Sequence, residues 1–125
     1  MTTLMENKSL NNSVLALSEN VVFEKLTIKE LINLTHNTDN GFAIIRSREE
    51  LINRGKDNIQ LRISIKKTCK AAISDMEILL KRYDCESNTD KKTTKLYKNK
   101  FLNIVSLSDK LQLEWQKHDL LLKRP

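Results

Sequence analysis

The stretch KKTTKLYKNKFLNIVSLSDKLQLEW, residues 91–115, decides the fold of this chain. If it is placed on an α-helix at about 100° per residue, six side chains fall within about 40° of a common direction. They are Tyr97, Phe101, Ile104, Ser108, Leu111 and Trp115. A helix with this seam must bury it against other helices. The stretch therefore predicts a long amphipathic helix, which we expect to run from about Asp90 to Leu121 or Leu122.

The lysines at the start of this helix lie on its other side. Lys91, Lys95 and Lys98 point away from the seam, Lys92 is also well away from it, and Lys100 lies at its edge. We interpret the run first as the solvated face of a bundle. Repulsion among the lysines would also favour a partner with negative charge, such as a membrane surface or an acidic protein. Nucleic acid is less favoured, because the aromatic residues that could stack on bases lie in the seam.

A second long helical pattern precedes this one. It begins with a capping-box spacing at residues 47–50 and runs to about Tyr83. Its apolar stripe steps by three and four through Ile65, Cys69, Ala72, Met76, Leu79 and Tyr83. A neighbouring stripe of Ile52, Ile59 and Ile63 predicts contact with a further helix, and Gly55 could divide the pattern into two pieces. Residues 85–90 are expected to form a polar connection.

The first third of the chain is less regular. Residues 1–13 are polar and predict a flexible N-terminal arm, and residues 14–26 predict one amphipathic helix. Thr27 and Glu30 have the capping-box spacing. A helix beginning there would place Ile28, Leu31, Ile32 and Thr35 on one face and end near residues 37–41, where Gly41 could supply a positive φ.

Length and composition bound the fold class. With 125 residues the chain is expected to form a single domain, and with only two glycines and one proline it favours long helices over tight turns. We therefore predict an all-α protein, an antiparallel bundle of three or four helices that spans residues 14–122.

Charge and cysteine content indicate the cellular compartment in which the chain is expected. Residues 1–40 carry three lysines and five acids, whereas residues 41–125 carry nineteen Lys or Arg and eleven acids, so the net charge of +6 belongs to the C-terminal part. We find no apolar stretch of bilayer-spanning length and no signal-peptide pattern. Two cysteines are too few for a disulfide framework. We expect a cytoplasmic protein.

The residues that could carry chemistry form no catalytic pattern. His36 and His118 have no partner at metal-ligand spacing, Cys69 lies in the apolar stripe, and Asp75 and Glu77 show no pairing for acid–base work. The two isolated glycines exclude a glycine-rich phosphate loop. The sequence thus predicts no enzymatic activity, no cofactor and no metal.

One alternative is a DNA-binding helix-turn-helix in LTIKELINLTHNTDNGFAII, residues 26–45. A capped helix, a polar turn and a second apolar stretch follow in order. Three residues disagree with that motif: Ile32 stands where a small residue is usual, His36 stands where the turn usually has glycine, and Gly41 falls inside the would-be recognition helix.

Three segments carry a resemblance to a known family: IIRSREELINRG from residue 44, IQLRISIKKTCKAAISDMEILLKRY from residue 59, and TTKLYKNKFLNIVSLSDKLQLEW from residue 93. Together they resemble the N-terminal helical (Habc-like) domain of SNARE proteins of the syntaxin-8 and syntaxin-6 type. Arg62, Lys66, Lys67, Lys98 and Lys100 match positions where those helices commonly carry basic residues. The sequence departs from that family in having neither a heptad SNARE motif nor a membrane anchor, and in its long first 40 residues.

The resemblance implies a regulatory role in membrane traffic and a location peripheral to endomembranes. From the residues themselves we predict a protein-interaction module that docks a partner helix or peptide, with a bacterial or viral helical adaptor or chaperone as an alternative. The candidate partner-binding residues are Lys66, Lys67, Lys70, Lys91, Lys95 and Lys98. The expected partner is another protein, acidic in character, with a membrane surface as a second possibility.

Overall fold

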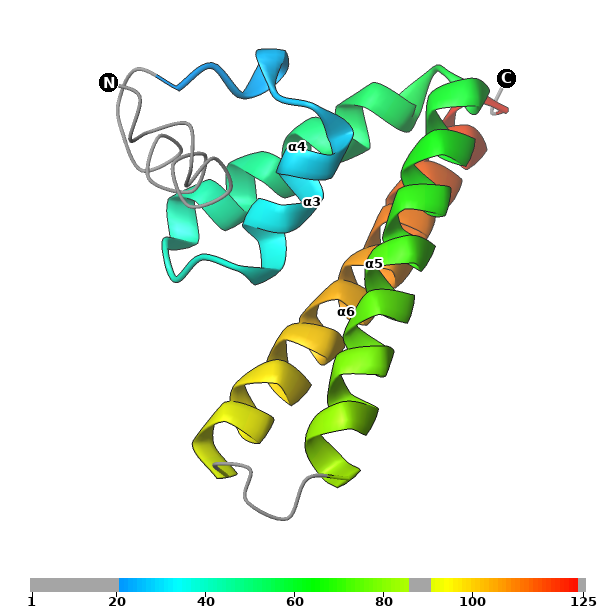
Figure 1. The fold of residues 1–125 in the computed structure, drawn as a ribbon. Coiled ribbons are helices and arrows are strands. Elements are labelled where there is room, and N and C mark those ends of the chain that lie inside the picture. Colours follow the sequence, from blue (N-terminus) through cyan, green and yellow to red (C-terminus); the bar gives the residue numbers. More distant parts are fainter. Residues whose placement is uncertain (1–20, 86–90, 124–125) are drawn as a thin grey trace.

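The protein is all-α, as predicted. The computed structural model describes residues 21–85 and 91–123, and the regular structure in these residues is entirely helical. The elements are a short 3-10 turn η1 (Phe23–Lys25) and the helices α3 (Ile28–His36), α4 (Gly41–Lys56), α5 (Ile59–Cys85) and α6 (Lys91–Leu122). Figure 1 shows α5 and α6 side by side as a long antiparallel hairpin, with α3 and α4 packed across one half of it. The hairpin therefore extends beyond α3 and α4 at its connected end.

The seam of α6 is confirmed. Ile104, Leu111 and Trp115 are buried, as is Leu107, which the pattern did not include. Tyr97, Phe101 and Ser108 are half-buried.

The main apolar stripe of α5 is confirmed, but the neighbouring stripe of Ile52, Ile59 and Ile63 is not. Ile65, Cys69 and Met76 are buried, while Ala72 and Leu79 are half-buried; the side chain of Tyr83 lies outside the described residues. Ile59 and Ile63, however, are 68% and 46% exposed. The predicted second stripe is wrong because the chain ends one helix at Lys56 and begins another at Ile59. Ile52 therefore lies on α4, out of phase with the other two.

The start of α4 also differs from the prediction. Its N-cap is Asn40, whose side chain accepts a 2.9 Å hydrogen bond from the amide of Ala43. Ser47, predicted as a cap, lies inside the helix and is fully buried. Gly41 is the first helical residue, and neither glycine has a positive φ. Asn40 is the cap because its oxygen accepts a hydrogen bond from a free amide about two turns earlier than Ser47, so the helix extends to include residues 41–46.

The break near Gly55 falls two residues later than the glycine. α4 continues through Gly55 to Lys56, and Asn58 then accepts the amide of Leu61 at 3.1 Å to begin α5. The buried glycine serves a packing contact, because a Cβ at this position would overlap the indole of Trp115.

The capping box at α3 is confirmed. The amide of Glu30 donates to Oγ1 of Thr27 at 3.0 Å, and the amide of Thr27 donates to Oε1 of Glu30 at 2.8 Å. The helix ends at His36, within the predicted region, and Leu31, Ile32 and Thr35 are buried on the expected face.

The helix predicted over residues 14–26 is not present in its described part. Residues 21–26 contain only the turn η1, whose buried Phe23 packs under Arg46 at 5.0 Å. The guanidinium of Arg54 donates to the carbonyls of Phe23 and Glu24 at 3.1 and 3.0 Å. These tertiary hydrogen bonds take carbonyls that a continuing helix would use internally. Residues 14–20, the predicted arm at residues 1–13 and most of the predicted connection, residues 86–90, lie outside the described residues.

Among the described helices, none is long and apolar enough to cross a membrane.

Candidate partner-binding surfaces

The six candidate lysines are all exposed, but the structure does not gather them into one site. Lys66, Lys67 and Lys70 lie on the first half of α5, and Lys91, Lys95 and Lys98 lie at the start of α6. Arg62 faces Asp119 across the hairpin. Counted from that contact at 1.5 Å per residue, Lys70 is about 12 Å along α5 and Lys98 about 31 Å along α6. The two groups are therefore separated by about 20 Å along the hairpin.

None of the ion pairs between described residues involves these lysines. Their charges are exposed to solvent, which agrees with the interpretation of a solvated face and leaves them accessible to an acidic surface.

A groove lies between α3 and α5, beside one of these lysines. Its volume is about 980 Å³. On the α3 side it is lined by Thr27, Lys29, Glu30, Ile32, Asn33 and His36, and on the α5 side by Lys67, Thr68, Ala71, Ala72, Asp75 and Met76. Of the six candidate lysines, only Lys67 belongs to this lining.

The groove exists because α5 presents small side chains to α3. Ala71 and Ala72 stand side by side in the middle of the α5 wall, where longer side chains would fill the space. Ile32 and Met76 are buried and close the floor. The hollow thus has an apolar floor and a charged rim, which is the arrangement found in grooves that bind amphipathic helices.

His36 lies at the end of the groove where α3 stops. Its side chain is half-buried, and Nδ1 lies 2.8 Å from the carbonyl oxygen of Ile32, to which it donates. Burial lowers the pKa of His36, and Lys100 lowers it further. The imidazole is therefore neutral at pH 7 and acts as part of the wall.

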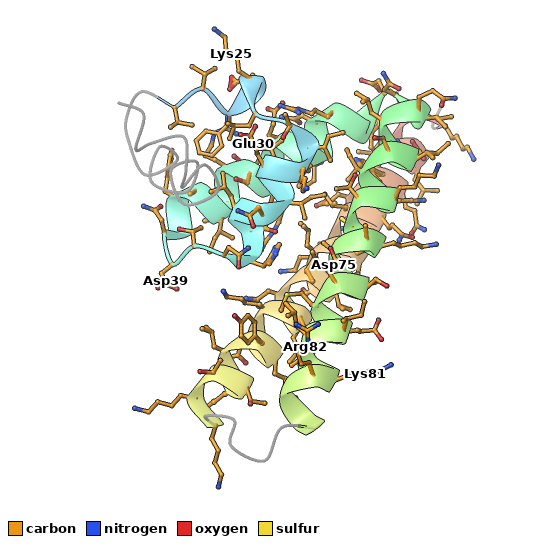
Figure 2. The ribbon with its side chains drawn as sticks, viewed as in Figure 1. Lys25, Glu30, Asp39, Asp75, Lys81 and Arg82 are labelled. Atoms are coloured by element: carbon orange, nitrogen blue, oxygen red, sulfur yellow. The ribbon has the colours of Figure 1, made fainter. Side chains whose placement is uncertain are left out.

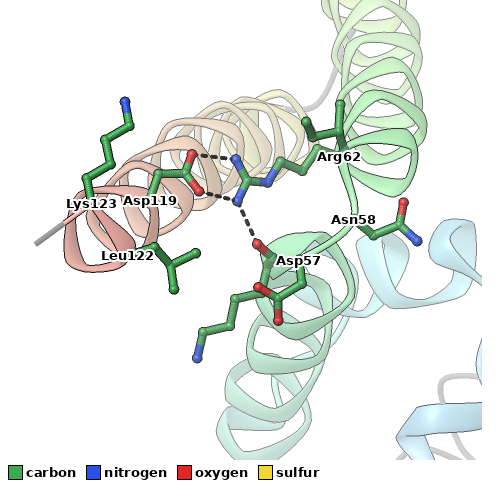
Figure 3. Close-up of a pocket in the computed structure, with 8 residues that line it drawn as sticks. Asp57, Asn58, Arg62, Asp119, Leu122 and Lys123 are labelled. Atoms are coloured by element: carbon green, nitrogen blue, oxygen red, sulfur yellow. Dashed lines mark hydrogen bonds and ion pairs between the residues drawn. The ribbon is translucent and has the colours of Figure 1, made fainter. Parts of the chain in front are cut away.

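A second hollow of about 410 Å³ lies where α4, α5 and the end of α6 meet. Figure 3 shows the side chain of Arg62 at its centre. The guanidinium donates two hydrogen bonds to the carboxylate of Asp119, at 2.8 and 2.9 Å, and one of 2.7 Å to the carbonyl of Lys56. It also lies 5.5 Å from the ring centre of Trp115.

Arg62 therefore stabilises the fold. It caps the carbonyl end of α4 and joins the start of α5 to the end of α6. The hydrogen bond from Arg62 lowers the pKa of the Asp119 carboxyl. The resemblance matched Arg62 to a position that commonly carries a basic residue, and the structure commits the donors of this residue within the fold.

The remaining polar residues in the described part of the chain form no reactive cluster. Nε2 of His118 lies 2.8 Å from Oδ1 of Asp57 at the surface. Cys69 is 1% exposed in the core, and burial raises the pKa of its thiol to about 11. Over residues 21–85 and 91–123, no three His, Cys, Asp or Glu side chains are placed to hold a metal ion.

α3 and α4 do form two helices joined by a short turn, at residues 37–40. The outer face of α4 presents Phe42 and Ile45, which are 66% and 56% exposed, together with the exposed acid Glu49. A recognition helix needs donors aimed at phosphates and base edges. This face offers apolar groups and a carboxylate in their place.

Comparison of the chain with protein-family models, curated proteins and solved structures found no match.

The sequence patterns missed the groove as a site. Lys29, Ala71 and Asp75 lie on two helices that are far apart in the chain, and no spacing within either helix indicates that they face each other. The pair of adjacent alanines in α5 was the one local sign that another backbone could approach closely there.

Proposed function

We propose that this chain is a non-enzymatic protein-interaction module that docks a partner helix or peptide in the α3–α5 groove. The observation that carries the proposal is the groove itself, with its buried floor of Ile32 and Met76 and its rim of charged side chains. Its walls extend over Thr27 to His36 and Lys67 to Met76. At 1.5 Å per residue these walls are about 13 Å long, which accommodates about two and a half turns of helix.

The exposed lysines support an acidic partner. Lys67 is on the rim, and Lys66 and Lys70 lie within one turn of it on α5. Charges at the border of a binding site mainly raise the association rate by steering a partner of opposite sign. Lys91, Lys95 and Lys98 would add to this field from the far end of the hairpin, towards an acidic protein or an anionic membrane surface.

The docking function can be tested with peptides selected on the full chain. A display library of short helical peptides is panned on the immobilised protein, and the binders are measured by fluorescence anisotropy. Ala71→Arg places a long charged side chain in the groove from an exposed position. Gln112→Arg makes the same change of charge at an exposed position on α6, outside the groove.

We expect Ala71→Arg to weaken binding at least tenfold and Gln112→Arg to leave it unchanged, with circular dichroism confirming equal helicity. Equal affinity of both variants for every selected peptide would contradict the proposal.

Two finer roles fit the same physical picture. The resemblance to SNARE N-terminal domains supports regulatory binding in membrane traffic, at a cytoplasmic site peripheral to endomembranes, and a helical adaptor or chaperone would use the groove in the same way. A heptad region and an apolar tail encoded downstream in the same reading frame would support the trafficking role. Co-localisation of the tagged chain with endomembrane markers would test it in cells.

DNA binding by α3 and α4 is the alternative from a different class. Its support is the two-helix arrangement and the basic C-terminal part, and the exposed Glu49 opposes it. Affinity for random duplex DNA, measured over a range of salt concentrations, separates the classes. A steep fall of the affinity with rising salt concentration would favour DNA binding. Undetectable binding at low salt would contradict it and favour the interaction module.

A further inference from the structure

We infer that the α3–α5 groove binds its helix in one direction, with the partner's first turn beside Asp75 and its last turn beside Lys29 and Lys67. This inference rests on the proposed docking function and adds the partner's orientation and charge order. Figure 1 shows that α3 and α5 run in the same general direction, so the groove has one end at the start of α3 and the other at its end. In Figure 2, Glu30 and Asp75 mark these two ends.

The end at the start of α3 is electropositive. Lys29 on α3 and Lys67 on α5 are both exposed and both line the groove. The amide groups at the first turn of α3 add a partial positive charge. Glu30, whose Oε1 accepts the amide of Thr27 in the capping box, opposes them with one negative charge against two positive ones.

The other end is more negative than the first, because it holds the carboxylate of Asp75. Asp75 is exposed and lies eight residues beyond Lys67 on α5, about 12 Å further along the groove. α3 ends here, so its last carbonyl groups add a partial negative charge. His36 is neutral because burial lowers its pKa. Lys100 acts on His36 at this end, and its ammonium lies 5.4 Å from the ring centre of Tyr97.

A helix in this field is most stable antiparallel to α3 and α5. Its positive first turn then faces Asp75, and its negative last turn faces the two lysines. Basic side chains in the first turn and acidic side chains in the last turn would strengthen the binding. This order is the reverse of the one that stabilises an isolated helix, where acids favour the first turn. Selection of basic-first peptides would therefore show that the charges of the groove decide the binding, and that the intrinsic helix stability of the peptides does not.

The test uses the full chain and a library of 14-residue amphipathic helices in which the first and last turns carry Lys or Glu at random. Panning on the wild-type protein should enrich basic-first, acidic-last peptides. A variant with Lys67→Glu and Asp75→Lys has the same net charge but the opposite order of charges along the α5 wall, and it should enrich the opposite order. We expect the two orders to differ about tenfold in affinity for the wild-type protein at low salt, from a few surface charge contacts.

The outcomes are distinct. Peptides that lose affinity for Ala71→Arg but show no charge order, or the same order on both proteins, would refute the direction and leave docking in place. If no selected peptide is sensitive to Ala71→Arg, both the docking function and the direction are refuted. Reversal of the enriched order on the charge-swapped variant supports both.

Discussion

Trp115 of α6 packs directly on Gly55 of α4, and its Nε1 donates a 2.9 Å hydrogen bond to the carbonyl of Ile52 in the same helix. The indole is 2% exposed. This contact fixes the distance between α4 and the hairpin, because the ring occupies the space that a side chain at position 55 would need.

Gly55→Ala should therefore destabilise the protein. Overpacking of this kind costs about 1–3 kcal/mol, and it outweighs the gain of up to about 1 kcal/mol from replacing a glycine within a helix. Urea denaturation followed by circular dichroism measures the change in the free energy of unfolding. Gly41→Ala is the matched control, since nothing lies within 4 Å of a Cβ there. It should be neutral or stabilising, and equal stability of the two variants would show that the Trp115 contact is looser than described.

The cap of α4 gives a second prediction. Asn40→Ala should lower the free energy of unfolding by about 1 kcal/mol, because the amide of Ala43 loses its acceptor. Ser47→Ala should have no cost, because the buried hydroxyl of Ser47 finds no hydrogen-bond partner within the described part of the chain. Asn53→Ala, at an exposed position inside α4, controls for helix propensity. A larger loss for Ser47→Ala than for Asn40→Ala would restore the capping box predicted at residues 47–50.

Acid should weaken the joint between α5 and α6. Arg62 lowers the pKa of Asp119 below its ordinary value of 3.8, so the unfolded chain binds this proton first as the pH falls. The contribution of the pair is present in full above about pH 5 and is lost as the pH falls through the lowered pKa. Asp119→Asn should be less stable than the wild type at pH 7, with a difference that shrinks below about pH 4. Asp39→Asn, at an exposed turn residue, should show no such change, and a constant difference for Asp119→Asn would argue against the Arg62 pair.

Cys69 should be inert in the folded protein. Burial raises the pKa of its thiol to about 11, and the residue is 1% exposed, so little thiolate forms and reagents cannot reach it. In a Cys85→Ser background, where Cys69 is the one remaining thiol, a thiol-specific chromogenic reagent at pH 8 should react only after denaturant is added. Rapid reaction under native conditions would show that this part of α5 unfolds locally and often.

The sequence predicted those parts of the fold that depend only on residues close together in the chain. The seam of α6 and the main stripe of α5 follow from helical periodicity, because residues three and four apart always share a face. The cap at Thr27 and Glu30 likewise depends on atoms of the same turn.

The errors arose where distant residues compete for the same groups. Arg54 donates to the carbonyls of Phe23 and Glu24 where a helix was predicted, and Asn40 caps α4 about two turns before the predicted cap at Ser47. Which residues of α5 share a face with Ile52 depended on where α4 ends, and the sequence predicted that division at Gly55, two residues too early.

The groove belongs wholly to the tertiary structure. Local spacing predicted that the segments of α3 and α5 are amphipathic helices. Only the angle at which α3 packs across the hairpin decided that Lys29 and Lys67 share one end of a hollow and Asp75 lies at the other, because that angle is set by the summed packing of all the helices and by Trp115 against Gly55.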